Sequence, residues 1–333
     1  MENEILALAR RVSALAEAKL RQINNVAQMT KILAINARIE AGRIGSRGAS
    51  FAVVADEVAS VSRAVETLAA ELDRDLTARM RDLDAAGAAV QGNRLADLAL
   101  NMIDIIDRNL YERSCDVRWW ATDSAVHEAC ADPSAAARAH AGDRLAVILD
   151  SYTVYLDLWV TNSDGVVIAN ARPSRYPDVL GSSVADTRWF KEAVATRSGA
   201  EFAVADVSRQ PRLGGAQSAV YATAVRAQGR THGRVIGTLG VFFDWEPQAR
   251  AVLRGVRLSE AERETTRCLV VDRTGLVLAA SDDRGVLEER ITLRAKGNSG
   301  FYLDEAGRTV GYAVTPGYET YTGLGWSGVI VGS

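Results

Sequence analysis

The chain has 333 residues, 48% of them hydrophobic and 24% charged, which is enough for two or three structural units and at least one sizeable core. Its formal net charge of -3 gives no electrostatic reason to expect nucleic acid or an anionic membrane as a partner. No stretch reaches the roughly 20 apolar residues of a membrane span, and the N-terminal residues lack the pattern of a signal peptide. Three cysteines without metal-ligand spacing fit a reducing compartment, so we expect a cytoplasmic protein.

Residues 1–92 have the composition of long helices, because they lack proline and are rich in Ala, Leu, Glu and Arg. Apolar residues recur there at intervals of three and four, which is the pattern of a coiled-coil seam. The seam positions are Val54, Val58, Val61, Val65, Leu68 and Leu72 on the second arm, and Leu8, Val12, Leu15, Val26, Met29 and Leu33 on the first. Gly42, Gly45 and Gly48 predict a reversal at about residues 42–49. A lone hairpin cannot bury both apolar faces, so we expect a homodimer whose hairpins form a four-helix bundle.

The remainder of the chain, residues 93–333, changes from helical to strand patterns. Gly87 and Gly92 are expected to loosen the end of the second arm, and a long helix is predicted at about residues 94–130. Strand patterns bounded by Gly, Pro, Asn or Asp turns begin near residue 145. The segment VTNSDGVVIA at residues 160–169 matches VVDRTGLVLA at residues 270–279, and both read as hairpins. The repeat predicts two similar modules in tandem, at about residues 145–255 and 256–333, and an α+β fold.

The segment ILAINARIEAGRIGSRGASFAVVADEV, residues 32–58, resembles the hairpin tip of methyl-accepting chemotaxis proteins. The resemblance implies a tip that binds a chemotaxis histidine kinase and its coupling protein. It places Ile35, Asn36, Glu40, Arg43, Phe51 and Val53 in the region of kinase, coupling-protein and dimer contacts. A polar residue such as Asn36 on a seam specifies register, and Glu40 and Arg43 can pair because they lie three residues apart on a helix.

The hairpin departs from that family in three places, the first of which is Gln28, where some members have a large apolar residue used in receptor clustering. Arg38 replaces a small alanine, and Ala49 and Ser50 replace an Arg-Gly pair in the turn. Each arm also ends before the family's methylation heptads, so adaptation by methylation is not expected. An alternative hypothesis is that the hairpin serves only dimerisation, or a partner outside chemotaxis.

Residues 93–333 resemble a double Cache domain, a sensor built from two PAS-like antiparallel-sheet modules. The resemblance rests on NLYER at residues 109–113, the hairpin at 158–169, DTRWFKEA at 186–193 and GTLGVFFD at 237–244, in that order. It implies that the first module holds a small ligand.

Strand alternation gives an independent prediction of the ligand site. In residues 155–160, Leu156, Leu158 and Val160 are expected on one face, and Tyr155, Asp157 and Trp159 on the other. An acid between two aromatic residues suits an amine-bearing or hydrogen-bonding ligand. The predicted ligand residues are Tyr155, Asp157, Trp159, Arg188, Trp189, Phe190, Asp206, Tyr221 and Asp244. The alternative is that the aromatic residues are core and that Asp157 and Arg188 form a structural ion pair.

Motifs for catalysis are not recognisable in the sequence. There is no Gly-rich phosphate loop, no Cys/His spacing of a metal site, and His127, His140 and His232 stand in no motif. We therefore expect no cofactor, no metal and no catalytic site. The sequence predicts a chemoreceptor-like transducer; a ligand sensor with a different partner, and an enzyme with an unrecognised site, are the competing hypotheses.

Overall fold

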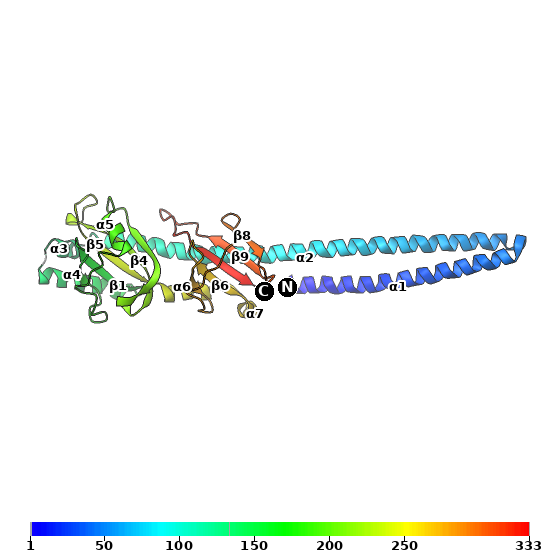
Figure 1. Cartoon of the computed structure of the whole chain (residues 1–333), viewed down its shortest axis with the longest axis horizontal. Helices are drawn as coiled ribbons and strands as arrows, with labels where there is room; N and C mark the ends of the chain where they lie inside the picture. Colours follow the sequence, from blue (N-terminus) through cyan, green and yellow to red (C-terminus); the bar gives the residue numbers. More distant parts are fainter. Residues whose placement is uncertain (1, 133, 333) are drawn as a thin grey trace. The chain divides into compact units, whose positions relative to one another are not determined.

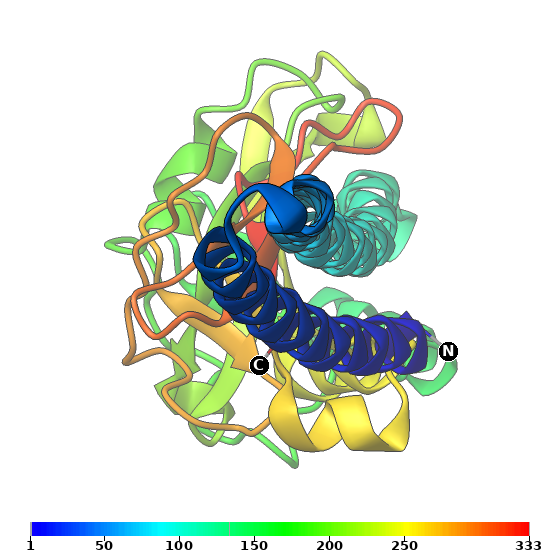
Figure 2. The ribbon, with the colours of Figure 1, turned by 90° about the vertical axis from the view of Figure 1, so that its right-hand side faces the viewer.

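A computed structural model describes residues 2–132 and 134–332, and the chain divides into two compact units, residues 1–91 and 92–333. Unit 1 is a helical hairpin (Figure 1). Helix α1 (Glu2–Arg43) is followed by a short 3-10 helix, η1 (Gly45–Gly48), and by α2 (Ala49–Trp120). The two arms lie side by side and are joined by the short turn at one end (Figure 2).

Three ion pairs show that the arms are antiparallel. Arg38 pairs with Asp56 at 2.7 Å near the turn, and Lys31 pairs with Glu66 at 3.0 Å. At the far end Arg10 pairs with Asp84 at 2.9 Å. The position on α2 falls as the position on α1 rises, so the predicted antiparallel hairpin is confirmed.

Small side chains, not large ones, line the contact between the arms. The buried positions on α1 repeat every seven residues, at Ser13, Leu20, Ala27, Ala34 and Ala41, and those on the other arm are Gly48 at the end of η1 and Ala55, Ala59, Ser62 and Ala69 on α2. The predicted seam of large residues is therefore wrong as a seam within the hairpin, since Val61 is 56% exposed and Leu68 64% exposed. Small residues let two helices approach closely, and this leaves the larger apolar residues beside the contact.

Helix α2 contradicts two further expectations. It continues without a break through Gly87 and Gly92 and ends at Trp120, so the long helix predicted at 94–130 is too long. A Cβ on Gly92 would lie 2.2 Å from the ring of Phe301, so this glycine permits close packing and does not loosen the helix. Helix α3 (Ser124–Ala131) begins after Asp123, which caps it by accepting from the Ala125 N–H.

The first module of unit 2 is a five-stranded antiparallel sheet. Helix α4 (Ala135–Ser151) precedes it, and α5 (Arg188–Val194) lies between its second and third strands. The strands are β1 (Tyr155–Asn162), β2 (Val167–Asn170), β3 (Ala203–Gln210), β4 (Ala216–Arg226) and β5 (Val235–Asp244), with 3-10 turns η2 (Pro211–Leu213) and η3 (Ala227–Gly229). Their order in the sheet is β2-β1-β5-β4-β3.

The second module repeats this topology. Helices α6 (Trp245–Arg254) and α7 (Glu260–Thr265) lead into it. Its strands are β6 (Arg267–Val271), β7 (Val277–Ala280), β8 (Ser299–Leu303), β9 (Thr309–Val314) and β10 (Ser327–Gly332), in the order β7-β6-β10-β9-β8. Both sheets therefore place their second strand at one edge and their third at the other, which confirms the predicted pair of similar modules and the α+β class.

The repeat extends to the turn chemistry of the matching hairpins. Asn162 accepts hydrogen bonds from the N–H groups of Asp164 and Val166. Asp272, 110 residues later, accepts from those of Thr274 and Leu276. Such Asx turns fix the reversal between two strands.

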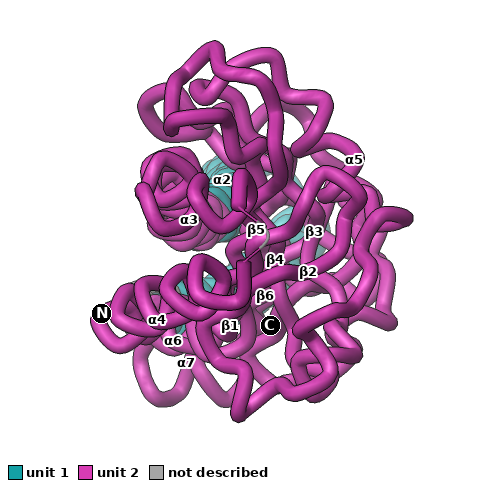
Figure 3. The backbone as a smooth tube through the Cα atoms, turned by 90° about the vertical axis from the view of Figure 1, so that its left-hand side faces the viewer, with its two compact units in different colours: residues 1–91 teal, residues 92–333 magenta. Residues whose placement is uncertain are grey.

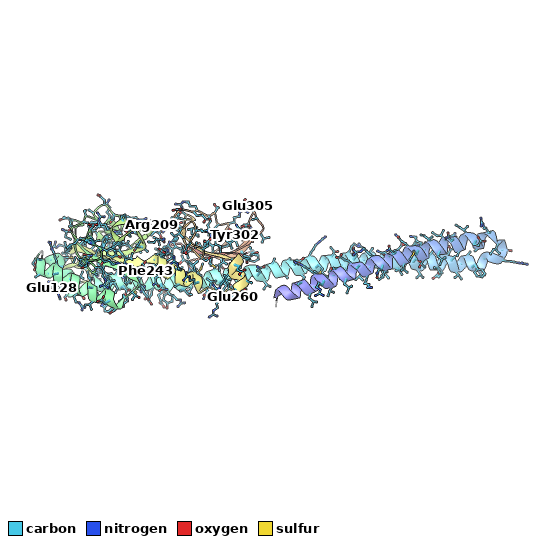
Figure 4. The ribbon with its side chains drawn as sticks, turned by 90° about the horizontal axis from the view of Figure 1, so that it is seen from below. Glu128, Arg209, Phe243, Glu260, Tyr302 and Glu305 are labelled. Carbon is cyan, nitrogen blue, oxygen red and sulfur yellow. The ribbon has the colours of Figure 1, made fainter. Side chains whose placement is uncertain are left out.

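The main core of unit 2 lies where α2 and one face of each sheet meet. This unit is magenta in Figure 3. Leu110, Leu158 and Phe243 belong to this core, and Phe243 is labelled in the first module in Figure 4. The other face of each sheet has its own smaller cluster of buried apolar residues. On the first sheet, this second face is the one covered by α5.

Candidate functional site

Aromatic side chains gather on the α5-covered face of the first sheet. The rings of Trp159 and Phe242 have centroids 4.0 Å apart, and Trp189 meets Phe242 edge to face at 6.0 Å. Gly240 makes room for this contact, since a Cβ there would lie 3.1 Å from the Trp189 ring. Phe190 joins the same cluster. Three of the predicted ligand residues, Trp159, Trp189 and Phe190, are therefore brought together.

Helix α5 holds two of these rings in place. Thr187 caps the helix, and its side chain accepts from the N–H of Phe190. Trp189 and Phe190 are 5% and 7% exposed, whereas Arg188 points away and forms an ion pair with Glu192 at 2.6 Å. The structure thus separates Arg188 from the aromatic cluster.

Two aromatic residues of this face were not predicted from the sequence. Phe242 lies between the aromatic rings, and Tyr176 comes from the loop before α5. Alternation from Asp244 along β5 would have indicated Phe242, because residues two apart share a face of a strand. Tyr176 lies in a loop without periodicity, so no sequence signal marks it.

Asp244 supplies a half-buried carboxyl beside this face. It stands at the end of β5 before α6, and its side chain makes no capping hydrogen bond there. Burial and the neighbouring Glu246 raise the pKa of Asp244, whereas Arg175 lowers it. The pKa of the Tyr176 hydroxyl is raised by burial and also by Asp157 and Asp244. Asp244 is therefore a carboxylate without a cationic partner at contact distance among the described residues.

Asp157 is satisfied by the protein itself. One carboxylate oxygen accepts from the backbone N–H groups of Leu158, Ala171 and Arg172 at 2.9 to 3.0 Å. The other accepts from Trp159 Nε1 at 2.9 Å and from Asn170 Nδ2 at 2.8 Å. Burial raises the pKa of Asp157 and these hydrogen bonds oppose that rise. Five donors fill both oxygens, so this geometry leaves no lone pair for a ligand amine and no ion pair with Arg188.

Tyr155 lies on the opposite face from the one expected. A bulge in the β1–β5 pairing falls between Tyr155 and Asp157, and it reverses the alternation at that point. Tyr155 therefore packs in the main core with Leu158, while Leu156 faces the α5 side. The Tyr155 hydroxyl donates to buried Asp116 on α2.

Tyr221 and Asp206 face the second module. The hydroxyls of Tyr221 and Tyr321 lie 3.0 Å apart in the main core. Asp206 accepts from Trp326 Nε1 at 2.8 Å. Burial raises the pKa of both Tyr221 and Asp206. Of the nine predicted ligand residues, the α5-covered face therefore holds Trp159, Trp189 and Phe190, with Asp244 at its edge, and the other five do not join this cluster.

The tip of the hairpin presents a second candidate site. The predicted tip residues are all exposed: Ile35, Asn36, Glu40, Arg43, Phe51 and Val53. Arg43 pairs with Glu40 at 3.4 Å, as their spacing suggested. Asn36 does not lie on the contact between the arms, which passes instead through Ala34 and Ala41.

The turn glycines have different roles. Gly45 has φ +71°, a conformation that favours glycine. A Cβ on Gly48 would lie 2.1 Å from the Ala41 carbonyl oxygen, so Gly48 permits the closest approach of the arms. Gly42 has open space around it.

Apolar grooves follow the hairpin on the side where the large residues lie. One, of about 430 Å³, is lined near the tip by Leu33, Phe51, Val54 and Val58 with the small residues between them. A second, of about 440 Å³, is lined by Ile23, Val26, Val61 and Val65. Exposed apolar surface of this extent on a polar rod is typical of a protein–protein contact.

Comparison with known proteins identifies relatives of the helical hairpin and of the two sheet modules. Residues 3–112 match the family described as "Methyl-accepting chemotaxis protein (MCP) signalling domain". The chain is 32% identical over 127 residues to the putative methyl-accepting chemotaxis protein AlkN of Alcanivorax borkumensis, which covers 33% of this chain and 19% of AlkN. It is 38% identical over 72 residues to the methyl-accepting chemotaxis protein McpS of Pseudomonas putida, and this match covers 22% of this chain and 11% of McpS. It is also 53% identical over 51 residues to a toxin coregulated pilus biosynthesis protein I of Vibrio cholerae, 15% of this chain and 8% of that protein.

The chain spans no more than about a fifth of the length of these curated relatives. Among solved structures, the ligand-binding domain of the amino acid chemoreceptor PctC of Pseudomonas aeruginosa, in complex with GABA, is similar with a TM-score of 0.55 at 16% identity. The match covers 73% of this chain and 100% of the chain of that domain. The ligand-binding domain of Pseudomonas fluorescens CtaA with L-alanine is similar with a TM-score of 0.50 at 17% identity, covering 72% and 96%. These likenesses show a Cache-type fold. Within residues 2–132 and 134–332, no helix combines the length and apolar character that a bilayer crossing requires.

Proposed function

We propose that this chain, which joins a signalling hairpin of the methyl-accepting chemotaxis type to a double Cache fold, is a cytoplasmic chemoreceptor-like transducer. It binds a small ligand in its first sheet module and signals through the hairpin tip to a chemotaxis-type histidine kinase and coupling protein. The observation that carries the proposal is the exposure of all six tip residues, within the segment that matches the family.

The ligand site is proposed on the α5-covered face of the first sheet. Trp159, Trp189 and Phe242 form an aromatic wall there, and Asp244 is a carboxylate in need of a cation. An amine-bearing ligand fits this combination, because a cation is attracted both by a carboxylate and by aromatic faces. Two solved structures with this fold hold GABA and L-alanine, both of which carry an amine.

The functional form is proposed to be a homodimer. Each hairpin leaves the large apolar residues of both arms exposed beside the small-residue contact. Pairing two hairpins along these grooves covers that surface in a four-helix bundle. The small-residue contact holds one hairpin together, and the large residues remain available for the second copy.

An alternative is that the hairpin meets a partner outside chemotaxis or serves dimerisation alone. The similarity of 51 residues of this chain to a protein described by a role in pilus biosynthesis supports this alternative.

Reconstitution with a chemotaxis kinase and coupling protein tests the proposal. We expect Glu40→Ala and Asn36→Ala to abolish control of kinase activity while light scattering still shows a dimer. Glu17→Ala, a change at a partly exposed position on α1 away from the tip, is the matched control and should leave kinase control intact. Unchanged kinase control in both tip variants would favour the alternative.

A thermal-shift screen of small metabolites, amines first, tests the sensor. A ligand that binds the native chain alone raises its melting temperature, by an amount that grows with concentration. Trp189→Ala should remove the shift, whereas Trp119→Ala, which alters a 68% exposed ring on α2, should not. A shift that survives Trp189→Ala would place the ligand elsewhere.

A further inference from the structure

A cavity lies between the two sheet modules of unit 2, away from the α5-covered face. It has a volume of about 210 Å³ and is bounded by β3, β4, α6, β7 and the loop that follows β7. At roughly 30 Å³ per water molecule this is space for about seven waters, or for one small metabolite. Sites between modules are common positions for small ligands.

Two residues from the first module line the cavity side by side. Arg209 on β3 is the register partner of Gln217 on β4, so their side chains project from the same face of the sheet. Gln217 is 8% exposed, yet its amide makes no hydrogen bond to any side chain or backbone group of the described residues. The Gln217 amide therefore offers a donor and an acceptor to a molecule in the cavity. Arg209, labelled in Figure 4, forms no ion pair within the described part of the chain.

Helix α6 supplies a buried group without a partner among the described residues. Arg250 Nη2 bonds Glu246 at 2.9 Å and Asp283 at 3.3 Å, but its Nε is buried and has no hydrogen-bond partner among the described residues. An Nε–H is a donor only, so the missing partner is an acceptor. The loop that carries Asp283 also holds two non-glycine residues in left-handed conformation, Asp283 at φ 56° and Leu287 at φ 63°. Such strain persists where the surroundings fix the backbone and is concentrated at ligand sites.

The charges around the cavity define the ligand further. Two cations, Arg209 and Arg250, stand with three carboxylates, Glu246, Asp283 and Glu288, which leaves one net negative charge. A ligand with several negative charges is therefore disfavoured, although the unpartnered donors need an acceptor. A molecule with one carboxylate and one cationic group meets both requirements. Trp245 and apolar residues of β7 form the remaining wall.

We infer that this cavity between the modules is a second ligand site, selective for a small zwitterion that presents its carboxylate to Arg209, Gln217 and Arg250 and its cationic group to the surrounding carboxylates. The site is distinct from the proposed site under α5. It contacts both modules, because Arg209 and Gln217 come from the first sheet and Leu278 from the second.

Calorimetric titration of the full chain with three probes of one carbon skeleton tests this inference. The probes are β-alanine, propionate and n-propylamine, which carry both charges, the negative charge alone and the positive charge alone. We expect β-alanine to bind at millimolar concentration and more tightly than the other two. Arg209→Ala and Gln217→Leu should each weaken its binding by about tenfold or more, since each removes a hydrogen-bond partner.

Two control variants separate the sites. Arg212→Ala removes an exposed arginine of the η2 turn that does not line the cavity, and Trp189→Ala alters the proposed site under α5. Arg212→Ala should leave β-alanine binding unchanged, and Trp189→Ala should leave intact the component of binding that Arg209→Ala removes. The inference is overturned if β-alanine does not bind, if propionate or n-propylamine binds equally well, or if Arg209→Ala and Gln217→Leu leave the affinity unchanged. Loss of binding in Trp189→Ala alone would assign the zwitterion to the α5-covered face instead.

Discussion

Asn170 Nδ2 donates to the buried carboxylate of Asp157 at 2.8 Å, and this contact joins the end of β2 to the middle of β1. The same carboxylate receives four further donors from the neighbouring chain. Asp157 thus fixes the backbone where the chain leaves β2, and it also holds Trp159 of the aromatic wall by a hydrogen bond. The residue that the sequence marked as a ligand contact is one that positions the wall.

Replacing this carboxylate should destabilise the chain. We expect Asp157→Ala to lower the free energy of unfolding by roughly 3 kcal/mol or more, because buried donors are left without an acceptor. Asp150→Ala is the control: Asp150 is exposed and pairs with Arg172, so its loss should cost under about 1 kcal/mol. Urea denaturation measures both. If Asp157→Ala changed the free energy of unfolding little but abolished ligand binding, Asp157 would be a ligand contact, as the sequence predicted.

Asp244 should make stability depend on pH in the opposite sense to a salt-bridged acid. Its folded-state pKa is raised by burial and by Glu246, so the folded chain holds this proton more tightly than the unfolded chain. Its contribution to stability therefore falls as pH rises from about 4, the ordinary carboxyl value, through the raised pKa. Asp244→Asn should be more stable than the native chain at neutral pH, and this advantage should vanish at lower pH. Urea denaturation at both pH values measures it, and a less stable Asn variant at neutral pH would contradict it.

Two glycines at the hairpin turn should respond oppositely to the same change. Gly48→Ala forces a methyl group against the Ala41 carbonyl and should destabilise the tip by roughly 2 kcal/mol. Gly42→Ala meets open space in the last turn of α1 and should stabilise it by up to about 1 kcal/mol. Hydrogen exchange of the amides near the turn measures both, with faster exchange expected for Gly48→Ala and slower for Gly42→Ala. Equal effects would mean that the arms do not approach closely there.

A charge on the large apolar stripe should break the proposed dimer. Val61 is 56% exposed and lines one of the two grooves, so Val61→Glu should shift a dimer to monomer, with at least about tenfold weaker association. Ser60→Glu places the same charge on an exposed position that does not line the groove and should leave the dimer intact. Light scattering distinguishes the species. A dimer that withstands Val61→Glu would show that copies pair elsewhere.

The sequence predicted the hairpin, its turn and the paired sheet modules because those features depend on local signals. Glycine at Gly45, the 3-4 spacing of apolar residues and the Asx turns at Asn162 and Asp272 each act within a few residues. The contact between the arms was assigned to the wrong residues, because periodicity counts a large valine as core and passes over Ala34 and Ala55. Whether the small or the large residues form the contact between the arms depends on the distance between the two helices. The spacing of residues along the sequence does not encode that distance.

The candidate site was predicted less completely for a similar reason. Trp189 and Phe190 followed from one contiguous motif, and the structure groups them with Trp159. A single bulge before Asp157 moved Tyr155 to the other face, and bulges have no fixed sequence signature. Gln217 and Arg209 become neighbours through strand pairing, which no local pattern records.

The seven-residue repeat of small side chains along the arms has a consequence for alignment. Since Ala27, Ala34 and Ala41 offer nearly the same surface, sliding one arm past the other by two helical turns would exchange one shallow contact for its near copy. Steric fit therefore discriminates weakly between alignments. The choice is left to the turn, where Gly48 meets Ala41, and to the charge pairs of Arg38 and Lys31. The alignment of the two arms is thus fixed by the turn and by the ion pairs. A stimulus that slid one arm along the other would meet little resistance from the small-residue contact between them.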